Sequence, residues 1–207
     1  MRGRLAALRD DARACTACEL YRNATQTVFG DGLSSSPLML VGEQPGDQED
    51  RVGEPFVGPA GKLLVRARRD AGLADTPTYV TNAVKHFRWE PRGKRRIHKT
   101  PGVEHIRACR GWLSDELAIV DPEVLVLLGA VAAKALAPEL RVMRDRGQPH
   151  ELDGRTTIVT VHPSSVLRSE QRSEAYDAFV ADLVVARECL RSVSASGAST
   201  AGGRTSR

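Results

Sequence analysis

Acidic, amide and imidazole side chains stand directly after three short apolar runs of this sequence. They are Glu43, Gln44, Asp47, Asn82 and His162. A carboxylate can act as a base, an amide presents both a donor and an acceptor, and an imidazole can do either. If the apolar runs are parallel strands, their carboxyl ends meet at one edge of the sheet, where such sheets bind ligands. We therefore expect a binding site for a polar small molecule at this edge.

Four cysteines form a second set of chemically capable residues. Cys15 and Cys18 form a CxxC pair, Cys109 lies far along the chain, and Cys189 is in an apolar helical context typical of a small core residue. Three thiolates and one further ligand suit zinc or an iron–sulfur cluster, and a redox dithiol is the alternative. By chemistry alone, the fourth ligand is either Cys189 or His86, which follows the second apolar run.

Positive charge is concentrated between residues 85 and 99. This segment has seven basic residues and one acidic residue, whereas the whole chain has a net charge of +4. The basic residues are Lys85, Arg88, Arg92, Lys94, Arg95, Arg96 and Lys99. A focused basic segment is typical of a contact with a phosphate backbone, and a solvated loop is the alternative.

The elements that must position these residues alternate between strand and helix. We predict strands at 37–42, 78–81, 123–128 and 156–161, and helices at 60–71, 103–119, 130–136 and 172–190. Alternation of this kind requires crossover connections and a parallel sheet with both faces covered. The sequence therefore predicts an α/β protein, a three-layer α/β/α sandwich around a four-stranded parallel sheet.

Length and composition fit a single domain of residues 1–190. The chain has 207 residues, and its Ser/Gly-rich stretch 191–207 lacks large apolar side chains, so we expect a disordered tail there. Neither a signal peptide nor an apolar run long enough for a bilayer is evident. These features favour an intracellular (cytoplasmic) protein with reduced cysteines and no membrane contact.

Several motifs resemble the iron–sulfur uracil-DNA glycosylases of family four, over about residues 12–190. They are residues 42–50 (GEQPGDQED), 53–61 (GEPFVGPAG), Asn82 and 162–165 (HPSS). The resemblance implies the α/β/α fold and a [4Fe-4S] cluster. Cys15, Cys18 and Cys109 match three of the family's four ligand positions, and His86 stands where the family usually has the other cysteine. It thus favours His86 over Cys189 as the fourth ligand.

Two departures from ordinary family-four members are similar to the X-type (UdgX-like) subgroup, which cross-links itself to uracil-containing DNA. Gln44 stands where those members have alanine, and the longer loop 93–101 (GKRRIHKTP) contains His98. In that subgroup the histidine of this loop attacks the deoxyribose. The resemblance thus implies that His98 traps C1′ after uracil leaves. By its chemistry, Glu43 could accept the ring proton of His98 and stabilise positive charge on the sugar, or polarise a water in an enzyme that uses water.

The resemblance also assigns the remaining residues. The implied uracil contacts are Gln44, Asp47, Phe56, Asn82 and His162. The expected DNA contacts are Lys94, Arg95, Arg96 and Lys99 of the basic segment, with Ser164 and Ser165. The chemistry agrees: His162 could donate to uracil O2, Asn82 matches O4 and N3–H, and Phe56 could stack on a flipped base. The alternatives are a histidine bonded to a neighbouring carbonyl, an asparagine that ties two loops, and a core phenylalanine.

Three functions follow as hypotheses. The first is a glycosylase, expected as a monomer, that excises uracil, with single-stranded DNA favoured because base flipping costs least there. It ends covalently attached through His98. The second is an ordinary family-four enzyme that hydrolyses with water and turns over. The third is a non-enzymatic iron–sulfur module that binds nucleic acid or transfers electrons.

Overall fold

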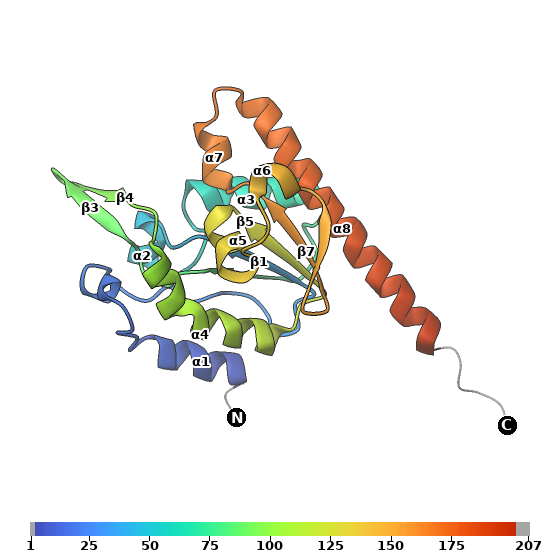
Figure 1. Ribbon diagram of the computed structural model, residues 1–207, viewed down its shortest axis with the longest axis horizontal. Helices are drawn as coiled ribbons and strands as arrows, with labels where there is room; N and C mark the ends of the chain where they lie inside the picture. The colour runs from blue at the N-terminus through green and yellow to red at the C-terminus, as the bar shows by residue number, and fades with distance from the viewer. Residues whose placement is uncertain (1–2, 202–207) are drawn as a thin grey trace.

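The computed structural model describes residues 3–201, which form a five-stranded sheet between two layers of helices (Figure 1). The strand order is β2-β1-β5-β7-β6. The parallel strands are β1 (Leu38–Gly42), β2 (Thr78–Asn82), β5 (Val124–Leu128) and β7 (Arg155–Thr160). These confirm the four predicted strands. The fifth, β6 (Pro149–Leu152), pairs antiparallel with β7 at the edge. The sequence does not predict β6, because this strand is polar, begins with proline and has alternately exposed and partly buried side chains.

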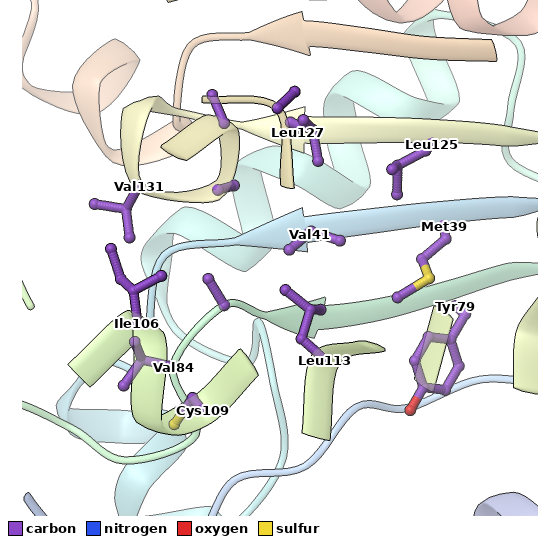
Figure 2. Close-up of a cluster of buried hydrophobic side chains, with 14 of the residues drawn as sticks. Met39, Val41, Tyr79, Val84, Ile106, Cys109, Leu113, Leu125, Leu127 and Val131 are labelled. Carbon is purple, nitrogen blue, oxygen red and sulfur yellow. The ribbon is translucent and has the colours of Figure 1, made fainter. Parts of the chain in front are cut away.

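Alternate side chains of β1 belong to two separate cores, because successive residues of a strand point to opposite faces. Met39 and Val41 pack with α1 (Arg4–Ala12), α4 (Val103–Val120) and α5 (Ala130–Leu136). Figure 2 shows this cluster, in which Ile106, Cys109 and Leu113 of α4 lie below the sheet. Leu38 and Leu40 pack on the other face. The predicted three-layer architecture is confirmed.

The second face is covered by three helices. They are α3 (Pro59–Asp70), α7 (Pro163–Arg168) and α8 (Arg172–Ala201). Proline at the first position of α3 and of α7 costs no backbone hydrogen bond, and its fixed φ suits a helix start. Two short helices, α2 (Asp47–Val52) and α6 (Val142–Asp145), and the 3₁₀ turn η1 (Glu19–Arg22) complete the chain.

A two-stranded hairpin projects from the body of the molecule (Figure 1). It consists of β3 (Trp89–Arg92) and β4 (Arg95–His98), paired antiparallel with Trp89 opposite His98. This is the basic segment of the sequence, and most of its side chains are exposed. The hairpin therefore needs contacts at its base to hold it, and these involve the site described below.

The last helix is longer than the sequence predicted. It continues past Leu190 to Ala201, since alanine and serine in this stretch are compatible with a helix, while positions 202–207 of the expected tail lie outside the described residues. Within residues 3–201, no helix has both the length and the apolar character needed to cross a membrane.

Candidate active site

A cavity of about 660 Å³ lies at the carboxyl ends of β1 and β2. This volume is within the roughly 300–1,000 Å³ range of small-ligand pockets. All the side chains that the sequence analysis assigned to catalysis or uracil recognition line it. They are Glu43, Gln44, Asp47, Phe56, Asn82, His98 and His162. The fold thus brings together residues from four separate stretches of the chain.

His162 caps the N-terminus of α7, and this position sets its tautomer. Its Nδ1 accepts the backbone N–H of Ser164 at 3.2 Å and lies 2.8 Å from the Ser164 hydroxyl. The hydroxyl of Ser165 donates to the His162 carbonyl at 2.7 Å. Burial lowers the pKa of His162 to about 4, so the ring is neutral at pH 7 and carries its proton on Nε2. Nε2–H remains as a donor.

Two glycines give the cavity its shape. A Cβ on Gly42 would lie 2.5 Å from Oδ1 of Asn82 and 2.6 Å from Cζ of Phe56, so only glycine leaves both side chains in place. Phe56 has φ of +58°, a left-handed conformation, and a Cβ on Gly61 would lie 1.6 Å from its carbonyl oxygen. The Phe56 ring is 6.4 Å from that of His162, at 29°.

The side-chain amide of Asn82 is ready to bind a ligand. Asn82 ends β2 and is buried, with a relative exposure of 3%. Across residues 3–201 its amide makes no hydrogen bond with protein, yet it lines the cavity. One amide donor and one amide acceptor therefore face the cavity without a protein partner.

Glu43 and His98 lie next to each other in the lining of the cavity. Nε2 of His98 lies 3.2 Å from Oε1 of Glu43. The angles do not make this a hydrogen bond, so Oε1 of Glu43 is buried with no hydrogen-bond partner among the described residues. The His98 ring packs 6.0 Å from that of Phe87, and its side chain is 47% exposed. A half-exposed imidazole thus stands beside an unpartnered carboxylate oxygen.

Gln44 lines the cavity, but its amide holds the hairpin. Nε2 donates to the carbonyls of Arg88 at 3.2 Å and Lys99 at 3.0 Å, and Oε1 accepts the Arg88 backbone N–H at 3.1 Å. These bonds link Arg88, the residue just before β3, to Lys99, the residue just after β4. Gln44 therefore fixes the base of the hairpin that carries His98, whereas alanine at this position has no group to do so.

Arg96 points inward from the exposed hairpin. Its guanidinium pairs with the carboxylates of Asp47 and Asp50, the latter at 2.6 Å, and it lies over the rings of Phe87 and Trp89. Partial burial opposes ionisation of Asp47, but hydrogen bonds from arginines, Arg96 among them, lower its pKa. From the sequence, Arg96 is expected among the DNA contacts. Its charge is instead paired within the protein. The sequence shows that Arg96 is charged, but it does not show that the side chain is largely buried.

The other basic residues of the hairpin are differently placed. Lys94 and Arg95 are exposed at the turn and the start of β4. Lys99 is exposed and pairs with Glu90 at 2.9 Å. A positive surface therefore extends from the His98 end of the hairpin to its tip.

Three cysteines lie around the N-terminal part of α4. Cys109 is buried and accepts the backbone N–H of Lys85 at 3.5 Å. Burial raises its pKa to about 11, and Cys15 and Cys18 are close enough to add to this rise. The indole N–H of Trp112, one turn further along α4, donates to Sγ of Cys15 at 3.1 Å. The fold thus gathers the CxxC pair and Cys109 in one region.

The two candidates for a fourth ligand lie in different places. His86 follows Lys85 directly, and its Nδ1 is buried without a partner in the described chain, while Nε2 contacts Thr27 at 2.9 Å. Cys189 packs in the core on the opposite face of the sheet. No three of these donors within residues 3–201 converge on a single-ion site. A cluster binds each ligand through a different iron, so its ligands lie further apart than those of one ion.

Several residues that line the cavity were not predicted from the sequence. They are Gly46, Gln48, Glu49, Pro59, Ala60, Thr100, Leu167 and Arg168. Most of them lie inside the segments that carry the resemblance, and Leu167 and Arg168 follow the HPSS motif within α7, so closeness to these motifs was the available signal. Arg168 is exposed and adds a positive charge to the rim.

The fold and the cavity define an α/β protein with a small-ligand pocket beside a basic hairpin. A model of the Uracil DNA glycosylase superfamily matches residues 29–184, and the chain belongs to this family. The chain is 38% identical over 160 residues to a type-4 uracil-DNA glycosylase of Thermotoga maritima, covering 76% of this chain and 80% of that one. It is 33% identical over 173 residues to one of Archaeoglobus fulgidus, covering 79% and 83%.

Proposed function

We propose that this protein excises uracil from DNA and then traps the deoxyribose covalently on His98. The observation that carries the proposal is the 3.2 Å approach of His98 Nε2 to Glu43 Oε1 within the cavity that Asn82 and His162 also line. Membership of the uracil-DNA glycosylase superfamily and the type-4 relatives support the excision. The trapping step rests on His98 and its surroundings.

Cleavage of the glycosidic bond leaves uracil with negative charge and the sugar with positive charge. The free Nε2–H of neutral His162 is suited to stabilise the charge that develops on uracil O2, as in an oxyanion hole. The Asn82 amide matches the O4 acceptor and the N3–H donor of uracil, and cytosine presents the opposite pattern. Phe56 supplies a face for the flipped base. These groups together favour uracil as the departing base.

His98 then acts as the nucleophile. The C1′–N1 bond has by then broken, its electron pair has left with uracil, and the lone pair of one ring nitrogen forms a bond to the cationic C1′. The imidazolium loses its other ring proton to solvent, directly or through Glu43. Oε1 of Glu43, which has no hydrogen-bond partner among the described residues, is suited to stabilise the cationic sugar and to orient His98. The product is a stable nitrogen–carbon bond between protein and DNA.

The substrate is uracil-containing DNA, with single strands favoured because flipping a base out of a duplex costs a few kcal/mol. Lys94, Arg95 and Lys99 are exposed on the hairpin that ends at His98, and Ser164 and Ser165 are next to the cavity. We infer that these residues contact the DNA backbone. A protein of this size can act as a monomer inside the cell.

We infer that four donors of this chain hold a [4Fe-4S] cluster. Cys15, Cys18 and Cys109 would supply thiolates, and His86 would supply its buried Nδ1, which lacks any other partner among the described residues. The cluster would cross-link the N-terminal segment to α4 and to the end of β2. Cys189 is not assigned, because it packs on the opposite face of the sheet.

A second candidate is hydrolysis by water with turnover, as in an ordinary family-four enzyme. The unpartnered Oε1 of Glu43 favours it, since this oxygen could hold a water in place of His98. The two candidates differ in the fate of C1′. In the first, the DNA stays on the protein, and in the second, an abasic site is released.

Denaturing gel electrophoresis after incubation with a uracil-containing oligonucleotide separates the candidates. We expect a heat- and detergent-stable adduct with the wild type and none with His98→Ser, which should still release uracil. His150→Ser on β6 is the matched control and should form the adduct normally. An adduct that persists in His98→Ser would remove His98 from its role. Free abasic DNA with the wild type would leave hydrolysis as the function.

A further inference from the structure

Lys85 and Glu116 form an ion pair inside the protein that the proposed chemistry does not use. Both side chains have no exposed area, and the ammonium contacts Oε2 of the carboxylate. Burying two charges is costly, and an apolar pair of the same size is often at least as stable. The stability of the fold alone therefore does not explain why a charged pair is found here.

Every hydrogen-bonding position of the pair is occupied. Besides Glu116, the Lys85 ammonium donates to Oγ1 of Thr81 at 2.7 Å and to the backbone carbonyl of Asn82 at 2.8 Å. Glu116 in turn accepts the Tyr79 hydroxyl at 2.8 Å, the Gly30 N–H at 3.1 Å and the Thr81 hydroxyl. The three ammonium protons thus have three acceptors in fixed directions, which makes the group rigid.

One of these acceptors belongs to a residue that lines the cavity. The carbonyl of Asn82 is held by Lys85, and the side chain of Asn82 faces the cavity. The next two residues are tied to β1, because Ala83 N–H donates to the Gly42 carbonyl at 2.9 Å and Val84 N–H to that of Glu43 at 3.0 Å. The ammonium therefore fixes the turn after Asn82, and this turn is hydrogen-bonded to Gly42 and Glu43 at the end of β1.

We propose that Lys85, oriented by Glu116 and Thr81, is a positioning residue that sets the selectivity for uracil over cytosine through the backbone of Asn82. This inference rests on the proposed reading of uracil by Asn82. A fixed amide rejects cytosine because a mismatched pocket leaves buried polar groups unpaired. An amide whose backbone can shift loses this penalty, so selectivity falls before general DNA affinity does.

The test compares binding of two oligonucleotides that resist cleavage, one with 2′-fluoro-2′-deoxyuridine and one with 2′-fluoro-2′-deoxycytidine, by fluorescence anisotropy. The main variant is Lys85→Met with Glu116→Gln, which removes both charges but keeps an acceptor for Tyr79 and Gly30. A milder variant, Thr81→Val, removes one acceptor of Lys85 without changing side-chain size. The control, Arg155→Met with Asp121→Asn, removes an ion pair at the opposite end of the sheet.

We expect the dissociation constant for cytosine divided by that for uracil to fall about tenfold in the main variant and about threefold in Thr81→Val, because cytosine is then rejected less strongly, with the control unchanged. Variants that fold and keep the wild-type ratio of dissociation constants would overturn the inference. If the double variant fails to fold by circular dichroism, Thr81→Val decides: an unchanged ratio overturns the proposal. A wild type without any preference for uracil would instead overturn the proposed function, and this inference with it.

Discussion

The inward-facing Arg96 should stabilise the protein far more than its exposed neighbour Arg95. Asp50 is fully buried, and Arg96 is 13% exposed, so the Arg96→Met substitution leaves a buried carboxylate without its cation. Removing one partner of a buried pair costs about 3–5 kcal/mol. Asp50 keeps the backbone N–H and hydroxyl of Thr25 at 2.6–3.1 Å, so we expect the lower end, about 3 kcal/mol.

Urea unfolding followed by circular dichroism measures this difference. Arg95→Met is the matched control, because an exposed side chain with no such partners should change the unfolding free energy by less than about 0.5 kcal/mol. Adding Asp50→Asn to Arg96→Met should recover part of the loss, since the buried charge is then gone. Equal unfolding free energies for Arg96→Met and Arg95→Met would refute the reasoning. Arg96 would then be a candidate for contacting DNA phosphate, as the sequence predicted.

Three further predictions concern the cavity and the hairpin. Gly42→Ala should abolish uracil release while leaving DNA affinity near normal, because its Cβ would collide with Asn82 and Phe56; release at a wild-type rate in a single-turnover assay would contradict this. Since burial lowers the pKa of His162 to about 4, the unfolded chain binds its extra proton from about pH 6.5 downward, and stability should fall by about 2–3 kcal/mol between pH 6.5 and 4. In His162→Asn this part of the pH dependence should vanish in urea titrations, and identical slopes would argue against a buried neutral ring. Lys94→Gln with Arg95→Gln should reduce the slope of log affinity against log salt on single-stranded DNA by about 1.4, and an unchanged slope would show that phosphate is held elsewhere.

The parallel sheet could be predicted because its strands are continuous apolar runs with clear ends. The run 124–128 is entirely buried, and glycine follows it at 129. The residues at the strand ends could also be predicted to meet, since parallel strands place their carboxyl ends together. Asn82 and His162 do line one cavity.

The hairpin could not be predicted as strands, because its stability comes from contacts distant in sequence. Its residues are polar and include Pro91, and local pattern gives no strand signal there. The amide of Gln44 and the carboxylates of Asp47 and Asp50 hold it instead. A charge count alone likewise treated Lys85 as part of a basic surface, whereas its partner Glu116 keeps it inside.

Intact-protein mass spectrometry after reaction with a short uracil-containing oligonucleotide tests the central claim most directly. The account predicts a species heavier by the oligonucleotide minus uracil, formed by the wild type and absent for His98→Ser. Free uracil together with protein of unchanged mass would contradict it.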